Sequence, residues 1–118
     1  LVNVERAKYG LQPLVMGDAN LTAAAQQRAE EIATVNSHVR PNGTKWYTVL
    51  SEYGVTDAAA GENAAWGSVS PEEVVNAWMN SEGHRANILD PEARAMGVGY
   101  YYNSSSTWGH QWIQLFTK

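Results

Sequence analysis

Residues 61–89 read GENAAWGSVSPEEVVNAWMNSEGHRANIL and predict one helix with an unusual polar segment at each end. Ser70 is the expected N-cap, because its hydroxyl can accept a hydrogen bond from an N–H that the first helical turn leaves unpaired. Pro71 stands at the first helical position and Glu73 three residues after Ser70, as in a capping box. The apolar residues that follow recur at helical spacing and predict one buried face: Val74, Val75, Trp78 and Met79. The helix is expected to end within residues 80–83.

A carboxylate and a histidine flank this helix. Glu62 lies in a run of Ala, Gly and Trp that indicates burial, and a buried carboxylate must be paired or have a shifted pKa. Taken alone, Glu62 predicts a structural carboxylate bonded to nearby backbone amides, or else a functional acid. His84 alone predicts a residue that opens a short helix with its ring in solvent, or else a site residue.

The composition predicts a single domain over residues 1–118 with one core. The net charge of −4 and the predicted isoelectric point of about 5.2 argue against non-specific nucleic-acid binding, which needs a basic surface. The absence of cysteine excludes a disulfide framework and leaves the compartment open. No segment is apolar enough to span a bilayer, and no signal peptide is visible. Leu1 already lies inside a helical pattern, so we expect a longer precursor.

The remaining pattern places helices before a terminal hairpin, which is typical of the α+β class. Helices are expected over residues 1–9, 19–34 and 45–53, and strands over residues 95–103 and 108–117. Asp18 is the expected cap of the second helix, and residues 56–61 are expected to form a connector. On the second helix, one face is predicted to be buried and consists of Leu21, Ala25, Ala29, Ile32 and Ala33. The opposite face is predicted to lie in solvent and consists of Gln26, Gln27, Glu30 and Glu31.

Several motifs together resemble the bacterial branch of the CAP superfamily, the SCP-like extracellular domains. They are LVNVER at residues 1–6, SHVRPNGT at 37–44, GEN at 61–63, the helix and the GHRANIL run up to residue 89, and WIQLF at 112–116. The resemblance covers essentially the whole chain. It implies a three-layer α-β-α sandwich with a small, mainly antiparallel central sheet, in a monomeric protein that is secreted or lies at the cell surface.

The same resemblance implies a cleft formed by His38, Glu62 and His84. From the local sequence alone, His38 would be a solvent-exposed histidine. Many eukaryotic relatives add a second glutamate, and the matching position here is Ser81. The ligand or cleft residues are therefore expected to be His38, Glu62, Asn63, Ser81 and His84. Arg85 and Asn87 are expected to brace the segment after His84 through hydrogen bonds.

Two imidazoles and one carboxylate suit a divalent cation such as zinc, although the spacing of the three histidines does not by itself predict a metal site. Our hypothesis places a weak metal site at His38 and His84, with Glu62 as the acceptor that holds one imidazole. The structural alternative is that Glu62 ties loops together and no ion binds.

The sequence contains no complete catalytic constellation, because neither Ser37 nor Ser81 stands in a nucleophile motif. A binding domain for a lipid, peptide or glycan is therefore predicted, with a metal-dependent hydrolase or peptidase as the alternative. The aromatic residues Trp46, Trp66 and Tyr100–Tyr102 are expected either to line a groove or to pack in the core. His110 is expected to lie outside the pocket.

Overall fold

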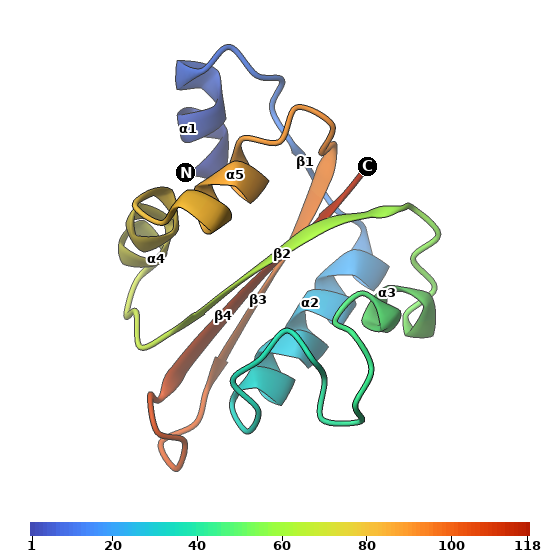
Figure 1. Ribbon diagram of the computed structural model, residues 1–118, viewed down its shortest axis with the longest axis vertical. Helices are drawn as coiled ribbons and strands as arrows, with labels where there is room; N and C mark the ends of the chain where they lie inside the picture. The colour runs from blue at the N-terminus through green and yellow to red at the C-terminus, as the bar shows by residue number, and fades with distance from the viewer.

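A central four-stranded sheet lies between two layers of helices in the computed structural model, which describes residues 1–118 (Figure 1). The strands are β1 (Val15–Met16), β2 (Ala59–Trp66), β3 (Ala95–Tyr102) and β4 (His110–Thr117), and their order across the sheet is β1-β3-β4-β2. One face is covered by α2 (Ala19–Ile32) and α3 (Thr48–Glu52). The other face carries α1 (Val2–Lys8), α4 (Pro71–Met79) and α5 (Glu82–Ile88). This arrangement confirms the predicted α+β sandwich.

The β3–β4 hairpin forms as predicted, with an antiparallel register from Ala95 opposite Thr117 to Tyr102 opposite His110. Two strands were not predicted. Residues 59–66 form β2, which pairs antiparallel with β4, although part of this segment was expected to be a connector. Its Ala, Gly and Asn residues have low strand propensity, and burial between two helical layers together with pairing to β4 overrides that propensity. The two-residue β1 pairs parallel to β3 at the opposite edge.

Strand β4 supplies side chains to both cores, which confirms that the sheet is covered on both faces. Ile113 and Leu115 pack with α2 and α3, whereas Trp112 and Phe116 pack with the α4 layer. Helix α2 approaches β3 closely, since a Cβ on Gly99 would collide with the carbonyl oxygen of Ala25. The alanines of α2 therefore pack directly on a neighbouring backbone, as the sequence indicated.

Helix α4 begins as predicted, since Ser70 Oγ accepts a hydrogen bond of 3.1 Å from the N–H of Glu73. The Glu73 carboxylate makes no hydrogen bond back to Ser70, so only half of the expected capping box forms. Residues 80–83 do end α4, but they lead directly into α5, which contains Gly83 and His84. No helix in the structure has the length and apolar character that crossing a membrane requires.

Side chains satisfy polar backbone groups along both edges of the sheet. On β2, the carbonyl of Glu62 accepts from the Asn87 amide at 3.3 Å, and the carbonyl of Ala64 accepts from the Trp78 indole at 3.1 Å. On β3, the Gln26 amide pairs with both backbone groups of Tyr100, at 2.8 and 3.1 Å. These contacts fix α2, α4 and α5 against the strand edges.

Trp78 is one of the two tryptophans in the core on the α4 side and is only 3% exposed. We expect Trp78→Ala to lower the free energy of unfolding by about 3–5 kcal/mol, because it leaves a cavity and removes the bond to Ala64. Urea denaturation followed by fluorescence or circular dichroism measures this loss. The matched control is Trp108→Ala at a 57% exposed tryptophan, where we expect a change within about 0.5 kcal/mol. Equal losses in the two variants would contradict the assignment of Trp78 to the core.

Candidate functional site

Glu62 on β2 is a fully buried carboxylate that is paired with a fully buried arginine. Arg28 of α2 donates from Nε to Oε2 at 2.7 Å and from Nη2 to Oε1 at 3.0 Å. Both side chains are 0% exposed. Such a two-point pair fixes the orientation of the carboxylate. Glu62 is therefore held by a guanidinium, and not by the backbone amides that its local sequence suggested.

His38 completes the contacts of the Glu62 carboxylate. Its Nδ1 lies 2.7 Å from Glu62 Oε1, while 55% of the His38 side chain is exposed. Because a carboxylate oxygen accepts hydrogen bonds, Nδ1 is the donor in this contact, which leaves Nε2 free of Glu62 on the more exposed side of the ring. The site thus combines an exposed imidazole with a buried carboxylate that sets its orientation and tautomer.

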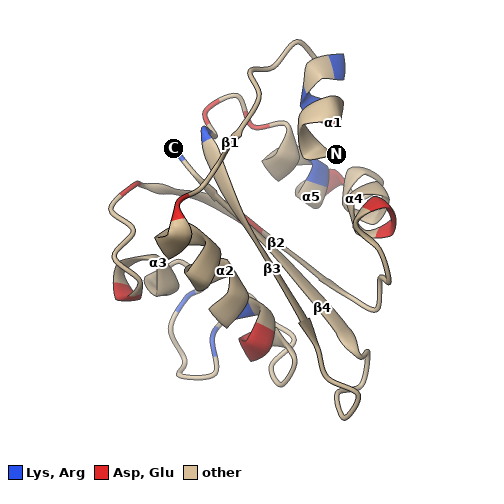
Figure 2. Ribbon diagram, turned by 180° about the vertical axis from the view of Figure 1, so that it is seen from behind, with Lys and Arg blue, Asp and Glu red and all other residues tan.

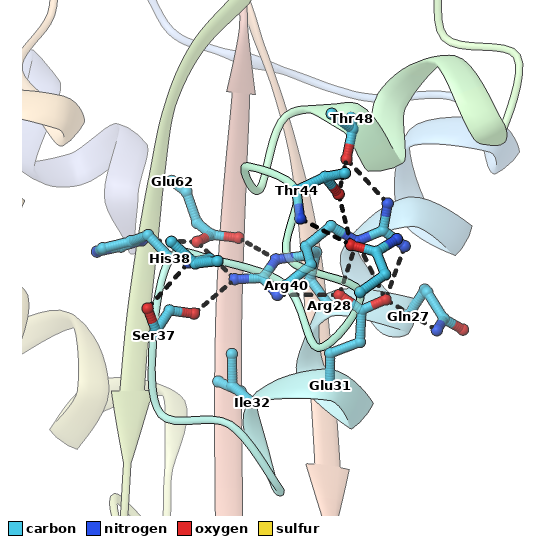
Figure 3. A network of polar contacts seen from close by, with 12 residues as sticks. Gln27, Arg28, Glu31, Ile32, Ser37, His38, Arg40, Thr44, Thr48 and Glu62 are labelled. Carbon is cyan, nitrogen blue, oxygen red and sulfur yellow. Dashed lines mark hydrogen bonds and ion pairs between the residues drawn. The ribbon is translucent and has the colours of Figure 1, made fainter.

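The Arg28–Glu62 pair is one end of a longer chain of alternating charges (Figure 3). Arg28 also donates to Glu31 at 2.9 Å and to the carbonyl of Ser37 at 3.0 Å. Arg40 binds Glu31 at 2.8 Å and reaches Glu52 of α3. This network fixes the loop that carries His38 to α2, α3 and β2.

Sequence reasoning missed Arg28 and Arg40 and placed Glu31 in solvent, whereas Glu31 is only 9% exposed. A signal was present, because Arg28 falls on the same helical face as the buried Ala24, Ala25 and Ile32. A charge on an apolar face requires a partner of opposite charge. The partner, Glu62, is 34 residues away, and only the fold brings it to α2.

His84 approaches the site from the other helical layer, on α5. Burial lowers the pKa of His84, and the neighbouring charge of His38 lowers it further, so the ring favours its neutral form. No hydrogen bond engages either ring nitrogen. The main chain at His84 is fixed by Asn63, whose amide donates to the His84 carbonyl at 3.1 Å.

Glu62 and Asn63 point to opposite faces of β2, because successive side chains on a strand alternate. Glu62 contacts α2, whereas Asn63 bonds His84 and Asn87 of α5. Since β2 is an edge strand, residues from the two helical layers meet at its free side. The bracing role expected for Asn87 is confirmed by its 2.9 Å bond to Asn63, but the side chain of Arg85 makes no hydrogen bond or ion pair.

The remaining predicted residue, Ser81, stands at the N-cap position of α5 without a side-chain hydrogen bond. None of the four cavities of the structure is lined by His38, Glu62 or His84, so no cavity coincides with the cleft expected at these residues. No group of three or more His, Cys, Asp or Glu side chains is arranged to hold a metal ion. Arg28 and His38 together bond both oxygens of Glu62, so this carboxylate has no unbonded oxygen to offer a cation.

The aromatic residues divide between the two expected roles. Trp46, Trp66 and Tyr101 pack against the core on the α2 side, and the Trp66 indole donates to the carbonyl of Ile32 at 2.9 Å. Tyr100 and Tyr102 are exposed on the opposite face of β3. His110 lies beside these two tyrosines, away from His38 and His84, with its Nδ1 2.6 Å from the Tyr100 hydroxyl.

Comparison with known proteins gives a consistent family assignment. The model of the cysteine-rich secretory protein family, CAP, matches residues 1–116. The chain is 43% identical over 115 residues to the uncharacterized protein YkwD of Bacillus subtilis, covering 96% of this chain and 44% of that protein. It is 36% identical over 101 residues to the uncharacterized membrane protein YlbC of the same organism, covering 84% of this chain and 29% of that one. The chain thus spans less than half the length of these curated relatives.

Solved structures show the same fold. An extracellular protein of Bacillus anthracis that contains an SCP domain superposes with a TM-score of 0.85 at 27% identity, over 99% of this chain and 37% of that one. An outer surface protein of Borrelia burgdorferi superposes with a TM-score of 0.84 at 23% identity, over 99% and 86% of the two chains. At 23% identity, the match to the Borrelia burgdorferi protein shows a shared fold and nothing about function.

The buried network makes stability depend on pH through Glu31. Burial alone raises the pKa of Glu31, but hydrogen bonds from Arg40, Gln27 and Arg28 outweigh it and lower the pKa to about 2 from 4.5. A carboxyl with a lowered pKa stabilises the fold above its unfolded pKa, and this stabilisation is lost as the pH falls. We expect about 3 kcal/mol to disappear between pH 5 and pH 2. Urea denaturation across this range measures the loss.

Glu31→Gln should flatten this pH dependence, because the amide cannot be protonated in the same range. Glu30→Gln is the matched control, since Glu30 is the exposed neighbour on the same helix, and it should keep the slope of the unmodified protein. The same slope in Glu31→Gln and in the unmodified protein would rule out Glu31 as the source.

Proposed function

This chain belongs to the cysteine-rich secretory protein (CAP) family, and from that premise we propose that it is an extracellular or cell-surface binding domain. In this proposal His38 and His84 hold a divalent cation, Glu62 orients His38, and the site captures a ligand without turning it over. The observation that carries the proposal is the 2.7 Å bond between His38 Nδ1 and the buried Glu62 carboxylate.

That bond has the form of the second coordination shell of a metal-binding histidine. Histidine ligands of metals commonly donate their other ring N–H to a carboxylate, which fixes the tautomer and increases the basicity of the free nitrogen. In His38 the free nitrogen is Nε2, on the exposed side of the ring. The buried Arg28 keeps Glu62 in place, so the imidazole is oriented before any ligand arrives.

His84 supports the proposal through its protonation state. A cation binds neutral imidazole, and the lowered pKa of His84 favours that form at neutral pH. Two nitrogen ligands leave most of the coordination sphere to water or to oxygen atoms of the bound molecule. A lipid head group, a peptide or a glycan offers such oxygens. This incomplete set of protein ligands predicts weak binding of the cation alone, by a monomer.

The location outside the cell rests on relatives. The Bacillus anthracis protein, which is 27% identical over 99% of this chain, is extracellular. YlbC is named as a membrane protein, which is compatible with a surface domain attached to another segment. The chain spans less than half the length of its curated relatives. The ligand and the partners of a full-length protein are therefore also part of what we propose.

The alternative is a metal-dependent hydrolase or peptidase. It is favoured by the same His38–Glu62 pair, because an imidazole oriented by a carboxylate is suited to act as a general base. Two contacts weigh against it. Glu62 is fully buried and bonded through both oxygens, so it cannot activate water itself. The Ser37 hydroxyl accepts from the N–H of Val39, and Ser81 bonds neither imidazole.

We expect zinc to bind with one site per chain and with an affinity that falls as the solution is acidified, because protons compete with the metal for the imidazole nitrogens. His38→Ala and His84→Ala should each weaken binding at least about tenfold, and Glu62→Gln by about 10–100-fold. Isothermal titration calorimetry measures these constants.

The matched control is His110→Ala, which removes the third histidine of the chain and should leave the affinity unchanged. Circular dichroism verifies that each variant is folded. Equal zinc affinity in the unmodified protein and in a His38→Ala/His84→Ala double variant would refute the cation site.

A peptide-library cleavage assay separates the binding domain from the hydrolase. We expect no cleavage above buffer, with or without added zinc, because no nucleophile or free carboxylate reaches the imidazoles. Cleavage that is abolished by Glu62→Gln would overturn the binding proposal and establish the hydrolase.

A further inference from the structure

The sheet face on the α4 side extends beyond the helices that pack on it. Helices α1, α4 and α5 lie over the β1 end of this face, while the β3–β4 hairpin extends past them (Figure 1). Val98, Tyr100 and Tyr102 follow one another at alternate positions of β3 and are all exposed. Their partners across the hairpin are Gln114, Trp112 and His110, respectively.

These side chains form a continuous aromatic strip, which we define as Val98, Tyr100, Tyr102, His110 and Trp112. The Tyr100 ring lies 4.5 Å from the Trp112 ring and 5.9 Å from the His110 ring, and Tyr102 lies 4.8 Å from His110. The hydrogen bond between the Tyr100 hydroxyl and His110 fixes the central ring. Tyr100, Tyr102 and His110 therefore present ring faces and hydrogen-bonding groups at a preformed surface, while Trp112, only 8% exposed, packs against Tyr100 from the core.

The strip opens at one end into an apolar cavity of about 160 Å³. Val98 and Trp112 line this cavity together with Val74 and Trp78 of α4, and Gln114 also contributes to the lining. A ligand that lies along the strip can thus place a small apolar substituent under the start of α4.

No charge accompanies the strip. Residues 95–117 contain no Asp, Glu, Lys or Arg, and neither do residues 63–70, which connect β2 to α4 (Figure 2). The protein has 20 charged side chains, 8 basic and 12 acidic, and all of them lie outside these two segments. The hairpin turn next to the strip consists instead of hydroxyl and amide residues, from Asn103 to Thr107.

We infer that the aromatic strip binds an uncharged saccharide chain, with the cavity receiving an acetyl substituent. A pyranose ring has an apolar C–H face that stacks on aromatic rings, and its hydroxyls match neutral donors and acceptors such as the tyrosine tips. A charged polymer would gain no electrostatic attraction from this surface. A membrane surface would favour cationic side chains beside the aromatic residues, and none is present between residues 95 and 117. The saccharide site is independent of the His38–Glu62–His84 site.

The test titrates the 118-residue chain with a tetramer of N-acetylglucosamine while amide shifts are followed by NMR and affinity by calorimetry. We expect saturable binding with shift changes concentrated on Tyr100, Tyr102 and His110. A glucose tetramer of equal length should bind more weakly, because it lacks the acetyl groups that the cavity receives. His38→Ala should bind the saccharide normally.

Tyr100→Ala/Tyr102→Ala should weaken binding about tenfold or more, since it removes both stacking faces. The matched control is Tyr47→Ala, which removes a 46% exposed tyrosine from the segment leading into α3, on the other side of the sheet. Circular dichroism and thermal unfolding verify both variants, and Tyr102→Ala alone serves if the double variant does not fold.

Three results would overturn the inference. One is the absence of saturable binding to either tetramer. A second is equal affinity in the tyrosine variant and in the Tyr47→Ala control. The third is that the strip residues respond to neutral phosphatidylcholine vesicles, or to self-association seen by ultracentrifugation, in place of the saccharide.

Discussion

The buried pair of Arg28 and Glu62 is the interaction on which the architecture of this domain depends. It joins the first long helix to an edge strand 34 residues further along the chain, at a place where neither charge reaches water. Removing one partner of such a pair leaves an uncompensated buried charge, which costs about 3–5 kcal/mol. Because the chain has no cysteine, ionic contacts hold the long connection between α2 and β2. Arg40 extends this role to α3 through Glu31 and Glu52.

The same pair links stability to the chemistry of the site. Glu62 uses one oxygen for both Arg28 and His38, so the group that fixes the strand to the helix also orients the exposed imidazole. His84 arrives from the opposite layer, where Asn63 and Asn87 hold α5 to β2. The two imidazoles are thus positioned by two separate polar networks, one on each face of a single edge strand.

Sequence patterns predicted the elements whose signals are local. The Ser70 cap, the helical spacing up to Trp78 and the alternation along the hairpin each depend on neighbours within a few residues. Strand β2 escaped prediction because its Ala- and Gly-rich sequence becomes a strand only when β4 and two helical layers enclose it. His38, Glu62 and His84 were identified through family resemblance, since no spacing rule connects them. Arg28 and Arg40 were missed because their partners are defined by the fold.

The polar contacts along the sheet margins also affect how two molecules of this domain can meet. An open strand margin is a template onto which the strand of another molecule can add. Here the amides of Gln26 and Asn87 and the indole of Trp78 already occupy positions that such a strand would use. Polymerisation through the margins would first have to displace these groups. These three side chains therefore oppose the addition of a foreign strand at the positions that they occupy.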